Sequence, residues 1–366
     1  MPADIILRSL TPPPLKATSS PAIASRADLL NGDRTGGGSV GSTGFSGVDG
    51  EWITLAGIGF EAVGNPLPAA YDTFGRDLYP RAFDGASVPE DEGSPESRWE
   101  PVIDGITSSG YEFDASTVMP GREFSALSKG AKTNLKNAKA QNGAPRSTDC
   151  IYSTFWIRFN ESLNSPPQPG PETRSDKILR VWDRPDGFGT RTSWEGPSKL
   201  HLVHKQGDSV TDYDQQDWPP RDFLFNNERR WHRCDYFCSA EAGRQAAWIN
   251  GKKYEYEFSK DPAASSNSFY TRLIGYDVSQ SAYITETLRH RLSEFYEQPS
   301  LAQVELSNSL TYDDSIEQKR IYQITEERTD SAVRFRAYYA DLNKNDAVYA
   351  HIVRSDGTAI DWGRIN

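Results

Sequence analysis

We predict an all-β protein from two observations on the sequence. The composition combines 29 Gly and 23 Pro with 11% aromatic residues, while only 36% of the residues are hydrophobic. Frequent turn residues and aromatics with few aliphatics are typical of sheets joined by long loops. In addition, apolar and polar residues alternate with a period of two in many segments, as in half-buried strands. The apolar runs are far shorter than the ~20 residues that cross a bilayer as a helix.

Alternation predicts strands along most of the chain after residue 50. In order, they lie at 52–55, 151–159, 177–182, 199–205, 230–238, 245–249, 254–258, 332–339 and 347–354. Asn250-Gly251 joins two of them, and this dipeptide favours a type I′ hairpin because both central residues need positive φ. The segment 341–346 separates the last two strands, which predicts a second hairpin. A lone hairpin is only marginally stable, so we expect contacts between residues 50–62 and residues 302–366.

The charge balance argues against one class of partner. Lys and Arg number 40 and Asp and Glu number 51, so the net charge is 40 − 51 = −11. A nucleic-acid binder that relies on a general basic field is therefore not expected. A basic stretch at 124–148 follows an acidic one at 84–104. Two interpretations are open, a pair of solvated loops or two halves of a contact surface.

The three cysteines, Cys150, Cys234 and Cys238, are too few for a disulfide framework. Cys234 and Cys238 stand four residues apart in one predicted strand, roughly 13 Å, beyond the ~7 Å between the Cα atoms of bridged cysteines. We therefore expect thiols made in a reducing compartment. His232 shares their strand face, which leaves a metal site or ordinary buried thiols as interpretations.

Residues 1–48 form a separate compositional zone, rich in Gly, Ser, Thr and Pro, with Phe45 as its one aromatic. Such a segment cannot bury enough surface to offset its ordering entropy. We predict an extended arm, held by a partner surface or packed over its own domain. Residues 1–20 lack the apolar core of about 7–15 residues found in signal peptides, so no secretory signal is expected.

Several of these strands resemble one known family. Tyr152–Phe159, Leu179–Trp182, Trp231 at the start of a strand, and Trp248-Ile249-Asn250-Gly251 resemble a concanavalin A-like lectin/glucanase jelly roll. The resemblance implies a jelly roll with a tendency to bind glycans or to serve as a surface module. Fold alone does not fix function.

The flanking segments resemble a second family. Gly50–Phe60, with its Gly57-Ile58-Gly59-Phe60, is similar to the entry of an IPT/TIG-type immunoglobulin-like domain. The resemblance implies a small immunoglobulin-like β-sandwich made of residues 49–68 with 301–366. The jelly roll, residues 69–300, would be inserted into it, and residues 1–48 would remain the arm.

The jelly-roll resemblance also implies where catalytic groups would lie. Glycoside hydrolases of this fold carry paired carboxylates on one strand, and the nearest match is Glu255 with Glu257. The Glu-x-Asp-x-Glu run that is usual in these hydrolases is absent. The pair also fits the solvent face of a hairpin, which is the alternative interpretation. Polysaccharide lyases use an Arg, a His or Gln and a Tyr on facing strands of the concave sheet. That pattern makes candidates of Arg180, His201, His204 and Tyr236.

Two further kinds of binding site are open from the residue types. The tryptophans Trp182, Trp194 and Trp218 adjoin polar loops and are candidates for stacking on sugars, although large aromatics also fill cores. Three oxygen ligands in a short loop, Asp212, Asp214 and Asp217, would suit Ca²⁺. They lack the glycine and the distal glutamate of an EF-hand loop, so a plain acidic loop is the alternative. No other cofactor is expected.

These observations lead to a prediction of binding and assembly without catalysis. The leading hypothesis is a virion or particle surface component, such as a phage head-decoration or tail-associated protein. It would be made in the host cytoplasm, be oligomeric in its assembly, attach to other virion proteins through the arm, and contact neither nucleic acid nor membrane. The alternative is an extracellular carbohydrate-binding or polysaccharide-degrading protein of the lyase type. Turnover of polysaccharides would separate the two.

Overall fold

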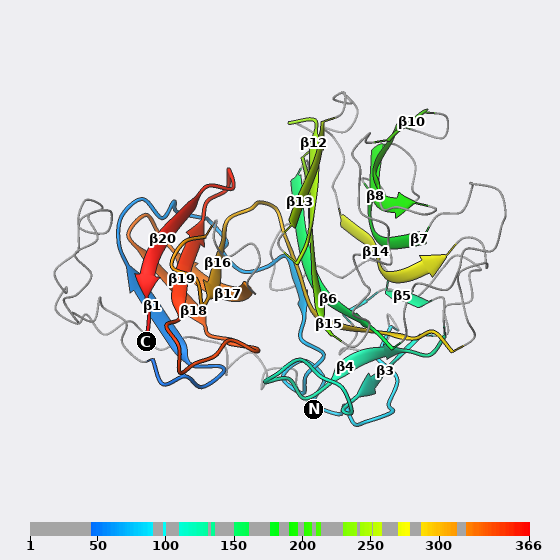
Figure 1. Ribbon diagram of the computed structural model, residues 1–366, viewed down its shortest axis with the longest axis horizontal. Helices are drawn as coiled ribbons and strands as arrows, with labels where there is room; N and C mark the ends of the chain where they lie inside the picture. Colours follow the sequence, from blue (N-terminus) through cyan, green and yellow to red (C-terminus); the bar gives the residue numbers. More distant parts are fainter. Residues whose placement is uncertain are drawn as a thin grey trace, which may run out of the picture.

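The computed structural model confirms the all-β class. It describes residues 45–90, 98–99, 110–130, 133–135, 150–160, 176–182, 190–196, 201–206, 210–213, 230–239, 242–250, 252–257, 270–278, 287–312 and 320–366. Within these ranges every regular element is a strand, and no helix is long and apolar enough to cross a membrane. The predicted arm lies almost wholly outside them. The strands form three antiparallel sheets (Figure 1).

The first sheet, called here the back sheet, has the order β13-β12-β11-β6-β15-β4-β3, with β2 also paired to β15. Its strands are β2 (Ala70–Asp72), β3 (Tyr111–Asp114), β4 (Ser125–Ser128), β6 (Cys150–Phe159), β11 (His232–Ser239), β12 (Arg244–Ile249), β13 (Lys252–Glu257) and β15 (His290–Gln298). β12 and β13 form the predicted hairpin, and Asn250 at its turn has φ 51°. The hairpin prediction is therefore confirmed.

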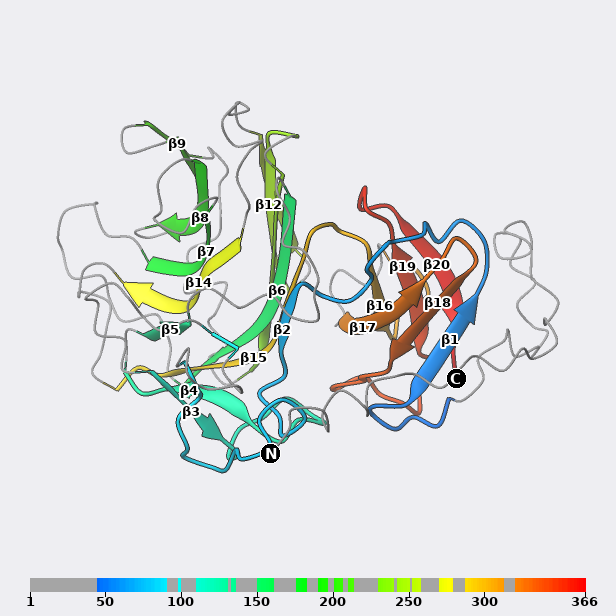
Figure 2. The same cartoon turned by 180° about the vertical axis from the view of Figure 1, so that it is seen from behind.

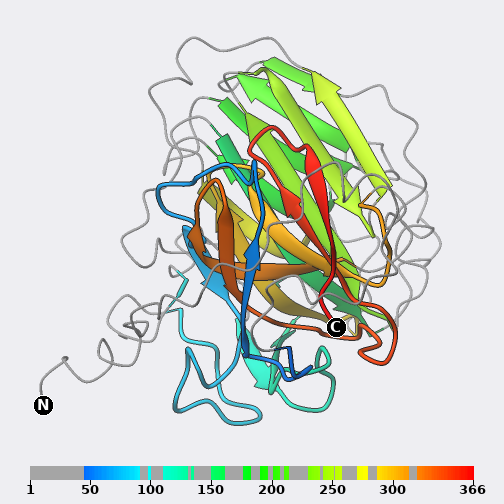
Figure 3. The same ribbon diagram turned by 90° about the vertical axis from the view of Figure 1, so that its left-hand side faces the viewer.

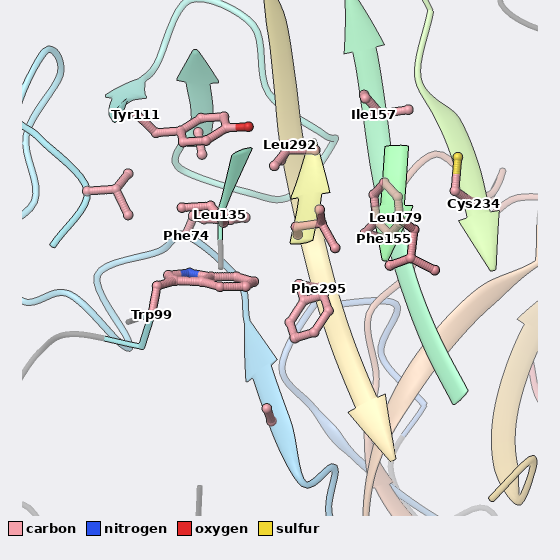
Figure 4. Packing of buried hydrophobic residues seen from close by; sticks show 14 of the residues in the cluster. Phe74, Trp99, Tyr111, Leu135, Phe155, Ile157, Leu179, Cys234, Leu292 and Phe295 are labelled. Atoms are coloured by element: carbon pink, nitrogen blue, oxygen red, sulfur yellow. The ribbon is translucent and has the colours of Figure 1, made fainter. Parts of the chain in front are cut away.

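The front sheet faces the back sheet and has the order β10-β9-β8-β7-β14-β5. Its strands are β5 (Thr133–Leu135), β7 (Asp176–Trp182), β8 (Thr190–Gly196), β9 (His201–Gln206), β10 (Val210–Tyr213) and β14 (Tyr270–Val278). Leu179 of this sheet is buried with Phe155 and Leu292 of the back sheet (Figure 4). Val181 and Ile274 belong to the same buried cluster. Two curled antiparallel sheets around this shared core make the predicted jelly roll.

The terminal sheet combines one early strand with the end of the chain. Its order is β1-β18-β17-β16-β19-β20, and its strands are β1 (Trp52–Ala56), β16 (Gln303–Ser307), β17 (Ile321–Arg328), β18 (Ala332–Arg336), β19 (Tyr349–Val353) and β20 (Ala359–Arg364). β1 pairs with β18, Trp52 opposite Arg336, so the predicted contact between the two segments is confirmed. The Trp362 indole donates to the Ala56 carbonyl at 2.9 Å and links β20 to β1, the two edges of the sheet.

The predicted second hairpin is wrong. β18 lies between β1 and β17, while β19 lies between β16 and β20, so the two strands are not neighbours. Their apolar residues still meet, because Val333, Phe335, Ala350 and Ile352 belong to one fully buried cluster. The curled sheet brings these faces together across its core. The apolar pattern correctly identified the buried faces, but it did not determine which strands pair.

The terminal sheet packs on the back sheet, on the side away from the front sheet (Figures 1 and 2). Seen from that side, its strands lie in front of those of the back sheet (Figure 3). Trp156 and Trp231 of the jelly roll belong to the same buried cluster as the core of the terminal sheet. The alternation of residues in the sequence gives no signal for this side-chain packing, because it does not show which outer faces meet.

Candidate functional site

The front sheet aligns several predicted site residues by its pairing register. Arg180 of β7 stands opposite Ser193 of β8, and Trp182 stands opposite Arg191. Trp194 stands opposite Leu179, which is a core residue. In β9, His201 pairs with Glu195 of β8 and His204 with Thr192. The lyase candidates Arg180, His201 and His204 therefore belong to one sheet.

Tyr236 does not join that set. It lies on β11 of the back sheet, only 1% exposed, and its hydroxyl donates to Gln245 Oε1 at 2.9 Å. Its position is explained by alternation, since the even-numbered residues of β11 face the core between the sheets. The grouping of Tyr236 with the front-sheet residues on one concave sheet is therefore wrong, and Tyr236 is a core residue.

Glu255 and Glu257 lie on β13, the edge strand of the back sheet. Glu255 is half-buried and forms an ion pair with Arg244 of β12, whereas Glu257 is exposed. The register places Glu257 opposite Arg244 and Glu255 opposite Ala246. The pair thus fits the charged edge of a hairpin, where charges discourage pairing with another strand.

The metal candidates divide into two groups. Asp212 lies on β10 opposite His204, while Asp214, Asp217 and the third tryptophan candidate, Trp218, lie outside the described residues. Within the part of the chain that the structure describes, no group of three His, Cys, Asp or Glu side chains is arranged to hold a metal ion.

The strand that carries His232, Cys234 and Cys238 has a structural role. All three side chains are buried, and the cysteines form no disulfide. His232 Nδ1 lies 3.0 Å from Asn250 Nδ2 at the β12–β13 turn. Burial raises the pKa of the Cys234 thiol well above its usual value, with the charge of Asp235 acting in the same direction. A thiol kept protonated in this way is a poor metal ligand.

A buried ionic network joins the jelly roll to the terminal sheet. The Arg233 guanidinium of β11 contacts Asp235 at 2.8 Å and also Glu305 of β16. Arg320 lies 3.5 Å from the other oxygen of Glu305. Burial alone would raise the pKa of Glu305, but Arg233 and then Arg320 outweigh it and hold the pKa below its usual value. The carboxylate therefore stays charged, and the network fixes one sheet on the other.

A second contact across the same interface starts from an ion pair within the jelly roll. Glu294 occupies a bulge in β15 with φ 58°, a conformation that costs a non-glycine residue energy. Its carboxylate binds the Arg122 guanidinium through both oxygens. The same guanidinium stacks over the Tyr338 ring at 3.6 Å, and the Tyr338 hydroxyl donates to the Pro120 carbonyl at 2.7 Å. The loop carrying Arg122 thus ties β15 to the terminal sheet.

Ser307, His351 and Asp361 form a chain of hydrogen bonds on the terminal sheet. Ser307 Oγ lies 2.8 Å from His351 Nε2, and His351 Nδ1 lies 2.8 Å from Asp361 Oδ1. The order resembles that of a hydrolase triad. However, Ser307 and His351 are fully buried, and Ser307 Oγ also accepts the Ser309 N–H at 3.0 Å. No substrate reaches that oxygen, so the three residues order the β16, β19 and β20 strands.

A buried carboxylate organises the loop after β2. Asp72 accepts hydrogen bonds from the Tyr79 hydroxyl, from the Trp99 indole at 2.8 Å and from the Phe74 N–H at 2.7 Å. Burial raises the pKa of Asp72 to about 6, although these hydrogen bonds act in the opposite direction. This group is structural, since it lies in the main core.

Some residues of interest were missed from the sequence. Arg191, Lys205 and Tyr270 occupy the same ladder row as Trp182: Tyr270 and Arg191 flank Trp182, and Lys205 flanks Arg191. Arg191 and Lys205 are each the one Lys or Arg of its observed strand, so neither drew attention in the sequence. The row itself was not available, because it depends on which strands pair.

Comparison with known proteins adds little beyond the fold. No protein-family model matches the sequence, and no curated protein matches it. Among solved structures, a PL-14 alginate lyase from Aplysia kurodai aligns with TM-score 0.37 and 8% identity over 60% of this chain and 98% of its own. Alginate lyase A1-II′, described as a member of polysaccharide lyase family 7, gives 0.33 and 9% over 51% and 82%. The binding domain of botulinum neurotoxin serotype G gives 0.33 and 11% over 68% and 69%. Similarities this weak say nothing of what this chain binds.

Proposed function

We propose that the protein binds an acidic polysaccharide on the face of the front sheet that is turned away from the core. One observation carries the proposal: the register of the front sheet aligns cationic and aromatic residues in a single row. Across β14, β7, β8 and β9 this row contains Tyr270, Trp182, Arg191 and Lys205. Neighbouring positions in such a row are about 5 Å apart.

Alternation assigns this row to its face. Val181, which precedes Trp182, is fully buried in the core between the sheets. Successive strand positions belong to opposite faces, so the row through Trp182 lies on the face opposite the core. A second row on that face runs through Arg180, Ser193, Val203 and Tyr213. It lies roughly 6–7 Å from the first.

The residue types suit an anionic sugar chain. Arginine fits carboxylates through two parallel hydrogen bonds, and aromatic rings supply flat apolar surface. The chain as a whole has a net charge of −11, so a row with two adjacent cations differs in sign from the average surface. Local charge of this kind steers an oppositely charged ligand. A site for neutral glycans would not need such a local positive charge.

The arrangement of sheets is consistent with a binding face in this position. The terminal sheet packs on the back sheet (Figure 1), and the ion pair of Arg233 with Glu305 and the stacking of Arg122 on Tyr338 hold it there. The jelly roll would thus be held by one face and would present the other. This favours the carbohydrate-binding alternative over the particle-surface hypothesis, for which the described residues offer no support.

Lyase chemistry is the second candidate, favoured by one observation. His201 stands on the same face as Arg180, opposite Glu195, and the second row ends in Tyr213. A lyase needs a cation to neutralise a uronate and a His or Tyr to move the proton. These groups are present on one sheet, with Tyr213 in place of the predicted Tyr236.

The experiment is a binding and turnover assay on the full-length protein. Affinity electrophoresis with alginate and pectate should retard it, and a neutral glucan should not. The double variant Arg191→Ala/Lys205→Ala should weaken binding about tenfold or more, since charged hydrogen bonds each contribute about 1.5–3 kcal/mol. Arg336→Ala/Arg364→Ala on the terminal sheet removes the same charge and should bind normally. Equal loss in both doubles would contradict a local site.

Turnover is measured on the same samples. Release of unsaturated uronates, lost in His201→Ala and Tyr213→Phe, would convert the binding proposal into a lyase. Binding without turnover would leave a carbohydrate-binding module. Absence of binding to every acidic polysaccharide tested would overturn the proposal. The particle-surface hypothesis would then be the better explanation.

We further propose that residues 49–68 and 301–366 form one immunoglobulin-like domain of IPT/TIG type, with residues 69–300 inserted. The pairing of β1 with β18 supports this division. Expression of residues 69–300 alone tests it: a folded product that still binds polyuronates would agree with it.

A further inference from the structure

A small cavity lies where the chain crosses between the jelly roll and the terminal sheet. Its volume is about 20 Å³, enough on this measure for roughly one water-sized occupant. Both crossing segments and β17 line it, including Val63, Leu67, Pro299, Ser300, Thr325 and Arg328. The cavity is therefore bounded by the segments through which the two parts of the molecule are connected.

Arg328 brings a buried positive charge to this cavity. The residue is 5% exposed. Its Nε donates to the Phe60 and Glu61 carbonyls at 2.9 and 3.0 Å, and its Nη2 donates to the Phe60 and Val353 carbonyls at 2.6 and 2.8 Å. All of these acceptors are neutral. Among the residues that the structure describes, Arg328 forms no salt bridge.

The Nη1 nitrogen of Arg328 has hydrogens that are not fully used in hydrogen bonds. Nη1 reaches only the Gln303 carbonyl, at 3.5 Å, and it carries two hydrogens. Glu61, whose charge supports the cation, directs its carboxylate oxygens to Ser355. Burial lowers the pKa of Arg328, with Glu61 opposing and Arg354 reinforcing the shift. The charge is thus buried without a full counter-charge.

Thr325 supplies a second polar group. It is 3% exposed, it lines the same cavity, and its Oγ1 has no hydrogen-bond partner among the described residues. Buried hydroxyls normally have a partner. A hydroxyl and a guanidinium on one strand, three residues apart and both on the cavity wall, form a donor pair.

We propose that this cavity binds one small monovalent anion of halide size, held by Arg328 and Thr325. A water molecule would satisfy the Thr325 hydroxyl but would leave the charge of Arg328 uncompensated, whereas an anion answers both needs. Space for about one water-sized occupant suits a halide better than a larger oxyanion. A bound anion would contact both crossing segments and β17 together, and would therefore stabilise the junction between the jelly roll and the terminal sheet.

The test uses the full-length protein without other ligands. Thermal unfolding is followed in sodium chloride, sodium bromide and sodium gluconate at equal ionic strength, since gluconate is too large for the cavity. The melting temperature should rise saturably with either halide and stay flat with gluconate. Crystals grown in bromide should show its anomalous signal beside Arg328. Equal melting curves in all three salts, or a water in place of bromide, would overturn the proposal.

Variants assign the effect to this cavity. Thr325→Val keeps the side-chain shape and removes the hydroxyl, so the halide should bind about fivefold more weakly. Thr325→Ser restores the hydroxyl and should restore the response. Thr358→Val, at an exposed hydroxyl in the turn between β19 and β20, should leave the response unchanged. Each variant is compared with itself in gluconate, which separates a loss of halide binding from a loss of stability. An undiminished halide response in Thr325→Val would place the anion elsewhere and refute the site.

Discussion

Arg233 of the back sheet and Glu305 of the terminal sheet form an ion pair to which solvent has almost no access, with side-chain exposures of 6% and 0%. The pair spans two sheets that do not share a backbone ladder. Asp235, Tyr152 and the Arg320 carbonyl complete the hydrogen bonds of Arg233. Such a pair contributes little net stability while it is intact, but removing one partner leaves a buried charge.

Glu305→Ala should therefore lower the free energy of unfolding by about 3–5 kcal/mol. Arg233 would keep Asp235 but lose the only acid that reaches it from the terminal sheet among the described residues. Urea denaturation monitored by tryptophan fluorescence measures the change. Glu257→Ala, at an exposed carboxylate, is the control and should stay within about 0.5 kcal/mol. Comparable losses in the two variants would show that the network does not join the sheets.

Trp362→Phe should destabilise the protein by about 1–3 kcal/mol. The substitution keeps an aromatic ring in the buried cluster but removes the donor that reaches the Ala56 carbonyl. A buried carbonyl left without its hydrogen bond accounts for this loss. Hydrogen exchange of the β1 amides gives a local readout, and faster exchange there is expected. Unchanged β1 exchange would show that the indole does not secure this edge.

Asp72 should make stability fall as pH rises between about 4 and 6. Its native pKa of about 6 lies above the ordinary value of 3.8, so the native state binds the proton more tightly than the unfolded state does. Stability from this group is complete below the unfolded pKa and is lost as pH rises through the native pKa. The shift corresponds to about 3 kcal/mol.

Asp72→Asn isolates that contribution. The difference in unfolding free energy between the variant and the wild type should change in favour of the variant as pH goes from 4 to 7, whatever its absolute value. Asp356→Asn, at an exposed turn, provides the comparison. A pH-independent difference for Asp72→Asn would mean that the carboxyl is charged throughout.

Two truncations test how the chain before β1 is held. Phe45 packs edge-on against Tyr339 at 5.7 Å, and Glu51 accepts the Gly47 N–H at 2.9 Å and contacts Ser46. Removal of residues 1–44 should leave the melting temperature unchanged, because that segment is poor in core residues. Removal of residues 1–48 should lower it by several degrees. Equal effects would mean that these contacts do not matter for stability.

Local chemistry explains what was predictable from the sequence. Asn250-Gly251 specifies its own turn, and alternation in 151–159 and 230–238 specifies buried strands. The pairing of β18 with β1 and β17, rather than with β19, has no local signal, since both arrangements bury Val333 and Ile352. The same limit applies to the proposed binding row, in which Lys205 and Trp182 become informative only once β7, β8 and β9 are placed side by side.

The charged interface between the back sheet and the terminal sheet could not be predicted from the sequence for a related reason. Arg233, Asp235 and Glu305 look like ordinary surface residues in alternating strands, and only the docking of a second sheet on that face buries them. Glu294 carried no sequence signal for its positive φ, which the bulge in β15 imposes.

The pairing of Trp52 with Arg336 also affects how the protein is made. β1 leaves the ribosome early, yet its partner strand is synthesised only after every strand of the jelly roll. Long-range pairing of this kind is slow, and domains form as units during synthesis. The jelly roll should therefore fold first while β1 waits as an unpaired apolar strand. That interval is when the nascent chain is most exposed to aggregation and most in need of a chaperone.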